Sequence, residues 1–341
     1  MSISENLEKY DPDGMHNVYD KWSDLARDAY DSEIHAVDFK DIDHVVFSGM
    51  GGSGAIGDLF ASILSKTDIH TSVVKGYTLP KTVDENTLVV SISVSGNTDE
   101  TLSILKQSIN LDCKKIGFSS GNMLETLCKK NNIEFRKIPK IHSPRASFPN
   151  FVYSILKTIG TIIPIKENDI SLSLDNLEKL QNEISSKNLS DNNPSLNMAN
   201  WIRGTPVIYY PWGLESAAIR FKNSLQENAK SHAIIENVIE SGHNGIVSWE
   251  RPSDMTPIMI EGTDDHTKTK ERWQILRQYF DENQIKYKEI STVDGGILSK
   301  IVCLIYLLDY ATIYYAIRLG INPSQMKSIN YIKDRIDALR L

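Results

Sequence analysis

Short apolar runs alternate along the first half of the chain with longer segments whose apolar residues recur at helical spacing. Strands that alternate with helices of about 10–15 residues form parallel sheets with helices on both faces. This half is therefore predicted to be a doubly wound α/β domain, preceded by one or two amphipathic helices in residues 10–40. The predicted strands are His44–Ser48, Thr71–Lys75, Thr87–Val94, Lys115–Ser119 and Glu134–Ile138, and the predicted helices are Ala55–Lys66, Thr98–Asn110, Met123–Asn131 and Asn150–Thr161.

The second half repeats this alternation, which indicates a duplicated domain. Between the halves, residues 166–194 are polar, with a partly helical pattern around Leu174–Ile184. We expect two doubly wound parallel-sheet domains in tandem, residues 1–165 and 195–341, joined by a linker at 166–194. The strands predicted in the second half are Pro206–Tyr210, Thr256–Ile260 and Tyr287–Ile290, and the helices are Glu215–Ala229, Lys268–Glu282, Ile297–Arg318 and Ser324–Leu339.

The composition narrows the choice of partners. The chain has 341 residues, of which 40% are hydrophobic and 24% charged, and its formal net charge is −7. A nucleic acid or an anionic membrane as the main partner would require a basic stripe on the surface, so we expect neither. A phosphorylated small molecule stays open, because a pocket can be locally positive on an acidic protein.

The cysteines and the apolar runs bear on the cellular compartment. Cys113, Cys128 and Cys303 are scattered, without a C-x-x-C pair, which is typical of a reduced, cytosolic chain. The segment Met1–Asp20 has no apolar signal-peptide region. The longest apolar stretch, Ile297–Leu308, is interrupted by a lysine and is too short to span a bilayer. We therefore expect a cytoplasmic protein.

The turn Gly49-Met50-Gly51-Gly52-Ser53-Gly54 lies between the first predicted strand and its helix. Backbone N–H groups and the helix dipole meet at such a junction, which makes it an anion site. The turn also matches the dinucleotide fingerprint G-x-G-x-x-G, which is a weak signal alone. A dinucleotide site requires an acidic residue at the end of the next strand. That strand ends in Lys75, which argues against NAD.

A second motif, Ser93-Val94-Ser95-Gly96-Asn97-Thr98-Asp99-Glu100-Thr101, follows another predicted strand. One interpretation is helix capping, with Asn97 or Thr98 as N-cap and Glu100 reaching back. The other is a pocket of hydroxyl donors for a phosphate monoester, which Ser53 at the neighbouring strand end favours. Neither loop holds the lysine of a nucleotide triphosphate site. The predicted phosphate contacts are Gly51, Gly52, Ser53, Ser93, Ser95 and Thr98.

These two motifs resemble the sugar-isomerase (SIS) domain family, and further segments resemble one branch of it. That branch is the bifunctional phosphoglucose/phosphomannose isomerases of archaea and some bacteria. The resemblance covers nearly the whole chain after the N-terminal helices. The segments are Pro144-Arg145-Ala146, Gln226-Glu227-Asn228-Ala229-Lys230, Glu240–Trp249 and Asn322–Lys333. It implies two SIS (flavodoxin-like) domains that interconvert glucose 6-phosphate, and mannose 6-phosphate, with fructose 6-phosphate through a cis-enediol.

The resemblance also assigns roles to single residues. It implies that Glu227 is the general base, and that Arg145 steadies the developing enediolate. It implies that His243, contributed by the partner subunit of a homodimer, and Lys333 assist ring opening. Position alone favours a different interpretation for Glu227, an exposed helix carboxylate paired with Lys230. Arg145 would then be a surface arginine and His243 a loop histidine bonded to backbone.

One segment departs from the family pattern. The family more often has Leu-Asn-His-Asn-Glu where this chain has Ser241-Gly242-His243-Asn244-Gly245. The histidine and the asparagine are present, but the acidic neighbour is missing.

The histidines and cysteines show no metal-ligand spacing, so we expect neither a catalytic metal nor another cofactor. Three rival functions remain open. One is a SIS-type regulator that binds a sugar phosphate without turnover, although no basic helix-turn-helix stretch accompanies it. The second is the isomerase half of an amidotransferase, and the third is a dinucleotide oxidoreductase.

Overall fold

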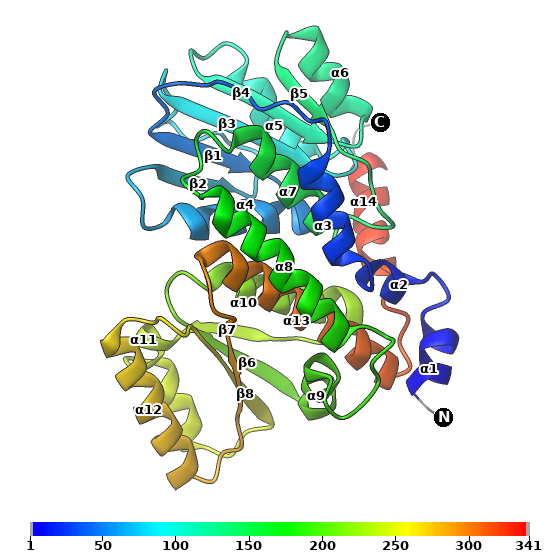
Figure 1. The fold of residues 1–341 in the computed structure, drawn as a ribbon, viewed down its shortest axis with the longest axis vertical. Coiled ribbons are helices and arrows are strands. Elements are labelled where there is room, and N and C mark those ends of the chain that lie inside the picture. Colours follow the sequence, from blue (N-terminus) through cyan, green and yellow to red (C-terminus); the bar gives the residue numbers. More distant parts are fainter. Residues whose placement is uncertain (1–2, 339–341) are drawn as a thin grey trace.

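The computed structural model describes residues 3–338, which form two parallel β-sheets with helices around and between them (Figure 1). The first sheet has five strands in the order β2-β1-β3-β4-β5. β1 and β3 are buried along their whole length, because helices cover both faces of the sheet. The strands are β1 (His44–Ser48), β2 (His70–Val74), β3 (Thr87–Ser93), β4 (Lys114–Ser119) and β5 (Glu134–Lys137), and the helices are α4 (Gly51–Leu64), α5 (Asp99–Ser108), α6 (Asn122–Lys130) and α7 (Phe148–Ile159).

The second sheet has the order β7-β6-β8-β9, which matches the first four positions of the first sheet. The predicted fold class, two doubly wound α/β domains, is confirmed. The sequence pattern does not predict β7 (Ile234–Asn237), because this short edge strand lacks a buried apolar run. The other elements are β6 (Thr205–Tyr210), α10 (Glu215–Ala229), α11 (Val238–Ser241), a 3₁₀ turn η1 (Gly245–Glu250), β8 (Met255–Glu261), α12 (Thr267–Glu282), β9 (Lys288–Ser291) and α13 (Ile297–Arg318).

Further helices precede the first sheet and connect it to the second, and most of them pack against α13. The N-terminal helices are α1 (Ile3–Tyr10), α2 (Met15–Tyr19) and α3 (Trp22–Asp31). Residues 166–194, which we expect to be a linker, contain α8 (Glu167–Ile184) and the start of α9 (Pro194–Trp201). α8 packs along α13 and buries Leu174 and Leu177. This polar segment therefore supplies one face of the core rather than an open connection.

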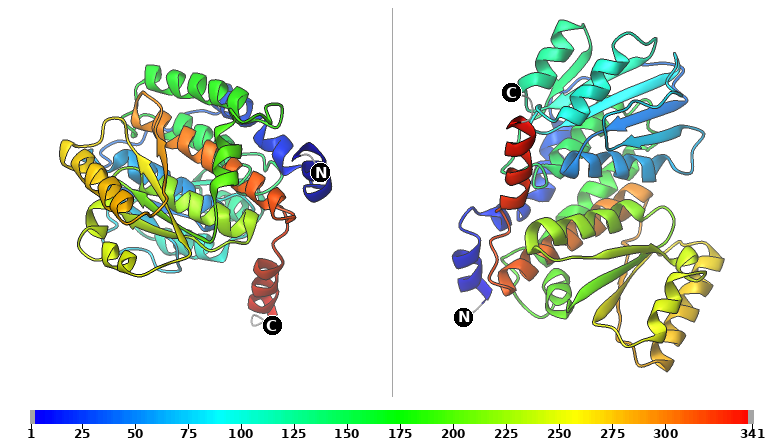
Figure 2. Two further views of the ribbon diagram at one scale, coloured as in Figure 1. Left: turned by 90° about the horizontal axis from the view of Figure 1, so that it is seen from below. Right: turned by 180° about the vertical axis from the view of Figure 1, so that it is seen from behind.

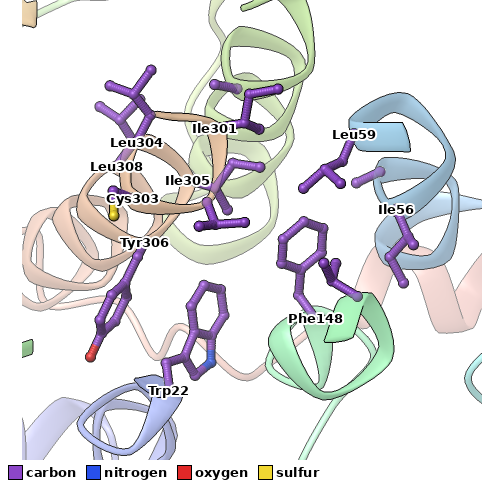
Figure 3. Packing of buried hydrophobic residues seen from close by; sticks show 14 of the residues in the cluster. Trp22, Ile56, Leu59, Phe148, Ile301, Cys303, Leu304, Ile305, Tyr306 and Leu308 are labelled. Atoms are coloured by element: carbon purple, nitrogen blue, oxygen red, sulfur yellow. The ribbon is translucent and has the colours of Figure 1, made fainter. Parts of the chain in front are cut away.

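α13 lies at the centre of the core (Figure 3). The Trp22 ring stacks on Tyr306 of this helix, with centroids 5.2 Å apart, and lies 6.1 Å from Phe148. The buried cluster extends into both domains. α13 is long and apolar enough to cross a membrane, yet 89% of its most apolar window is buried within the protein. Its composition is therefore explained by its place in the core.

The strand order decides where the two predicted phosphate motifs meet. β1 and β3 are neighbours, and Ser48 pairs with Ser91 in register. The connections from these two strands run to opposite sides of the sheet, which opens a crevice at their carboxyl ends. The glycine turn follows β1 and the hydroxyl-rich loop follows β3, so the fold brings them to the same crevice.

The last helix, α14 (Lys327–Ala338), extends away from the main body, as Figure 2 shows. It begins three residues later than the sequence predicts, and Leu339, its expected end, lies outside the described residues. Ile329, Tyr331, Ile332 and Ile336 are all exposed on it.

Candidate active site

A cavity of about 990 Å³ lies between the end of α10, the segment that leads into α14, and the glycine turn. Its size is at the upper end of the ~300–1,000 Å³ that small-molecule sites occupy. Its lining includes Gly51, Asn223, Gln226, Glu227, Lys230, His232 and Lys327. Gly51, one of the predicted phosphate contacts, and Glu227, the predicted base, therefore line the same cavity.

Glu227 and Arg145 form an ion pair at the edge of this cavity. Arg145 Nη1 lies 3.2 Å from Glu227 Oε2, with 2% of the arginine side chain and 23% of the glutamate side chain exposed. The surface interpretation of both residues is wrong: the arginine is buried, and Lys230 Nζ donates to the backbone oxygen of Glu227 instead of its carboxylate. The pair places a fixed positive charge beside a partly solvated carboxylate.

Three further groups fix the Arg145 guanidinium. Its Nε donates to Asn228 Oδ1 at 2.7 Å, next to Glu227 on α10. Its Nη2 donates to the backbone oxygen of Pro323 at 2.6 Å, and its Nη1 contacts Met326 Sδ at 3.0 Å. The guanidinium therefore ties the first domain to α10 and to the segment before α14.

The glycine turn touches the same arginine through backbone. A Cβ on Gly52 would lie 3.1 Å from Arg145 N and 3.1 Å from the carbonyl carbon of Pro144. Ordinary contacts of this kind are about 3.5–4.0 Å. Glycine at position 52 is what lets the first turn of α4 lie directly against the backbone that carries Arg145.

The hydroxyl cluster between β1 and β3 is held together by hydrogen bonds. Ser53 Oγ accepts from the backbone N–H of Val94 at 3.2 Å, so the glycine turn is bonded to the end of β3. The hydroxyls of Ser93 and Thr98 are 2.9 Å apart, and Ser95 Oγ accepts from the N–H of Asn97 at 3.3 Å. Ser53 and Ser93 are buried, and Ser95 is exposed.

The capping interpretation of this loop fails in its main point. Thr98 occupies the N-cap position of α5, but its side chain makes no capping hydrogen bond there. Asn97 Oδ1 accepts instead from the N–H of Met123, and Glu100 accepts from the Tyr77 hydroxyl. The side chains thought to cap the helix are engaged elsewhere.

Sequence reasoning undervalued Lys230, which lines the cavity. It ends α10 in the left-handed conformation, with φ of 55°, and this turns its chain back toward Glu227. Burial, reinforced by the nearby Arg145 charge and partly offset by Glu227, lowers the pKa of Lys230 to about 8. Its position directly after Glu-Asn-Ala in the motif was the available signal.

His243 and Lys333 are not among the residues that line the cavity. His243 is exposed between α11 and η1 on the second domain, and Lys333 is exposed on α14. The fold of one chain therefore joins Glu227, Arg145 and the glycine turn, but leaves these two predicted residues apart from them.

Gly245, where the chain departs from the family pattern, lies against Glu236. The carboxylate of Glu236, on β7, occupies the space where a Cβ at position 245 would lie. Its Oε2 is buried and has no hydrogen-bond partner among residues 3–338, and burial raises the pKa of Glu236. A side chain at position 245 would have to displace this carboxylate, and a second acidic group there would lie next to it.

Comparison with known proteins adds independent observations. Residues 38–156 match the SIS domain, and residues 191–336 match the bacterial phospho-glucose isomerase C-terminal SIS domain. The bifunctional phosphoglucose/phosphomannose isomerase of Caldicellulosiruptor bescii is 31% identical over 88% of this chain and 91% of its own. The D-glucosamine-6-phosphate 4-epimerase of Sulfolobus acidocaldarius is 27% identical over 94% of this chain and 97% of its own.

Among solved structures, a hypothetical protein of Thermus thermophilus superposes with a TM-score of 0.74. It is 13% identical and covers 98% of this chain and 93% of its own. At this identity the likeness concerns the fold alone.

Proposed function

Because this chain belongs to the bifunctional phosphoglucose/phosphomannose isomerase family, we propose that it interconverts glucose 6-phosphate and mannose 6-phosphate with fructose 6-phosphate. It is an aldose–ketose isomerase. The observation that carries this proposal is the Glu227 carboxylate, 3.2 Å from a buried arginine, in a cavity that the glycine turn also lines.

The chemistry requires a proton to move between two carbons. In the aldose-to-ketose direction, the Glu227 carboxylate takes the proton from C2, the C–H electrons form the C1–C2 double bond, and the C1 carbonyl electrons move onto O1, which takes a proton from water. The protonated Glu227 then returns a proton to C1, while O2 gives its proton to water and becomes the ketone oxygen. The Arg145 guanidinium stabilises the negative charge that develops on the enediolate oxygens.

The phosphate is the handle that holds the sugar for this step. We assign it to the N–H groups of Gly51 and Gly52 and to the hydroxyls of Ser53, Ser93, Ser95 and Thr98. Support comes from the first turn of α4, where backbone N–H groups and the helix dipole favour an anion. The close contact of Gly52 with the backbone of Arg145 holds Arg145 at a fixed position relative to this turn.

Ring opening needs groups that Glu227 does not supply. We propose that His243 of the partner subunit in a homodimer carries the proton between the ring oxygen and O1, and that Lys333 assists it. The exposure of His243 on the second domain is consistent with a role outside its own chain. The mechanism uses no metal and no cofactor, and we place the enzyme in the cytoplasm.

One assay separates the proposed isomerase from a regulator without turnover and from an epimerase. Purified protein is offered fructose 6-phosphate, glucose 6-phosphate, mannose 6-phosphate or D-glucosamine 6-phosphate, with EDTA present, and the products are separated and identified. We expect the three hexose 6-phosphates without an amino group to interconvert, and Glu227→Gln to abolish this. Binding of the sugar phosphates without turnover would favour a regulator. Epimerisation of glucosamine 6-phosphate alone would instead favour the activity named for the Sulfolobus relative.

A further inference from the structure

A cluster of buried charged groups lies directly behind the Glu227–Arg145 pair. Arg220 on α10 donates from Nε and Nη2 to Asp309 Oδ2 on α13, at 2.9 and 2.6 Å. Ser224 Oγ donates to the other carboxylate oxygen at 2.5 Å, and the Tyr19 hydroxyl donates to Asp309 Oδ2 at 3.1 Å. The side chains of the ion pair are 3% and 0% exposed.

Such a pair is expensive to bury, and similarly sized apolar side chains often stabilise a core as well or better. Burial alone would lower the pKa of Arg220, but Asp309 raises it above the ordinary value, so the guanidinium keeps its charge. Since stability gives little reason for the pair, its other contacts indicate what it does.

The first of these contacts is with the backbone of Arg145. Arg220 Nη2 donates to the carbonyl oxygen of Arg145 at 2.8 Å. The same guanidinium lies 4.7 Å from the centre of the Phe148 ring, at the start of α7. Arg220 therefore fixes the backbone at Arg145 through a hydrogen bond, and Asp309 fixes Arg220 through the ion pair.

A second connection runs to the Arg145 side chain. Asn228 accepts from Arg145 Nε and donates from Nδ2 to Thr312 Oγ1 at 2.8 Å. Thr312 and Asp309 are three residues apart on α13 and so lie on one face of it. The same face of α13 is thus connected to Arg145 twice. Asp309 is connected to the Arg145 backbone through Arg220, and Thr312 is connected to the Arg145 side chain through Asn228.

We propose that Arg220 and Asp309 are positioning residues for the isomerisation, and that they hold the Arg145 guanidinium where the enediolate charge develops. This inference rests on the proposed function. A charged donor lowers the barrier to the extent that it is already aimed at the developing charge. Catalytic groups must be held to within about 0.5 Å for this, by neighbours that are themselves locked.

The test compares two variants with wild type. Asp309→Asn keeps the shape and removes the charge, and Arg220→Met with Asp309→Leu replaces the whole pair by apolar groups of similar size. In both, we expect kcat to fall at least about tenfold, with the KM for fructose 6-phosphate changed less than about threefold. If Asp309→Asn does not fold, the apolar double variant carries the test.

A binding measurement separates positioning from a general loss of structure. A five-carbon aldonate 5-phosphate, whose carboxylate imitates the enediolate, should bind at least about tenfold more weakly to both variants. Glucitol 6-phosphate, which has the phosphate but no such charge, should bind as it does to wild type. Tyr314→Phe, which removes a buried hydrogen bond between α13 and the backbone oxygen of Ile184 away from the ion pair, is the matched control and should keep kcat and both affinities.

Combining Asp309→Asn with Arg145→Ala decides whether the carboxylate acts through the arginine. We expect the double variant to be no slower than Arg145→Ala alone, because the group to be positioned is gone. Independent, additive losses, or equal weakening of both analogues, would overturn the inference. A wild-type protein that binds the aldonate without turnover would overturn the proposed function while leaving the affinity comparison decisive for Asp309.

Discussion

Gly52→Ala tests whether the glycine turn sets the position of Arg145 for catalysis. The added Cβ would lie 3.1 Å from two backbone atoms of Pro144 and Arg145, so that segment must move by a few tenths of an ångström. Such overpacking costs about 1–3 kcal/mol. The lower entropy of the unfolded chain with alanine offsets about 0.4–1 kcal/mol of it. We expect a net loss of about 0–2.5 kcal/mol in the free energy of unfolding.

The effect on catalysis should exceed this small loss of stability. A misplacement of 1 Å costs roughly 100-fold in rate, so a shift of a few tenths of an ångström at Arg145 corresponds to roughly four- to tenfold in kcat. The N–H of residue 52 stays in place, and we therefore expect KM to change less than about threefold. Steady-state kinetics with fructose 6-phosphate and thermal unfolding measure the two effects.

Gly57→Ala is the matched control on the same helix. Its Cβ would be equally crowded, 3.0 Å from Phe47 Cβ and 3.3 Å from Val73 Cγ1, but against side chains away from the site. We expect a comparable loss of stability with kcat unchanged. The reasoning is refuted if Gly52→Ala keeps the wild-type kcat, or if Gly57→Ala loses as much.

Two further predictions concern the dimer and Lys230. Mixing inactive Glu227→Gln and His243→Ala subunits should restore about a quarter of the wild-type activity. Half of the dimers are then mixed, and each mixed dimer has one intact site out of two. No recovery of activity after subunit exchange would exclude a shared site. The pKa of Lys230 is about 8, below its ordinary value of 10.5. Between pH 8 and 10.5 the folded chain therefore binds fewer protons at Lys230 than the unfolded chain does, and the free energy of unfolding rises with pH in this range. Lys230→Met should weaken this rise in urea unfolding at pH about 7.5 and 9.5, and an unchanged slope would contradict the assignment.

The sequence predicted most of the local structure and the placement of the glycine turn and the hydroxyl-rich loop at neighbouring strand ends. α13 has the predicted bounds, and β1 and β3 carry their motifs to neighbouring strand ends, because strand length and turn chemistry are encoded locally. β7 was missed, since a short edge strand gains its structure from the sheet beside it.

The site needed tertiary information as well. Glu227 and Arg145 are 82 residues apart, and position alone favoured solvent exposure for both. The resemblance identified them, but it is the packing of α10 against the first domain that makes them a pair. Arg220 and Asp309 gave no local signal, because charged residues within long helices are usually solvated.

The fate of the C2 proton tests the central claim, that Glu227 moves it. The reaction is run from glucose 6-phosphate in D₂O, and deuterium at C1 of fructose 6-phosphate and at C2 of the recovered aldoses is measured by NMR. The Glu227 side chain is 23% exposed, so the proton that it holds exchanges in part with solvent before it is returned. We predict that wild type introduces some deuterium at these carbons and that Glu227→Gln introduces none. Isomerisation or deuterium uptake by Glu227→Gln at the wild-type rate would contradict the claim.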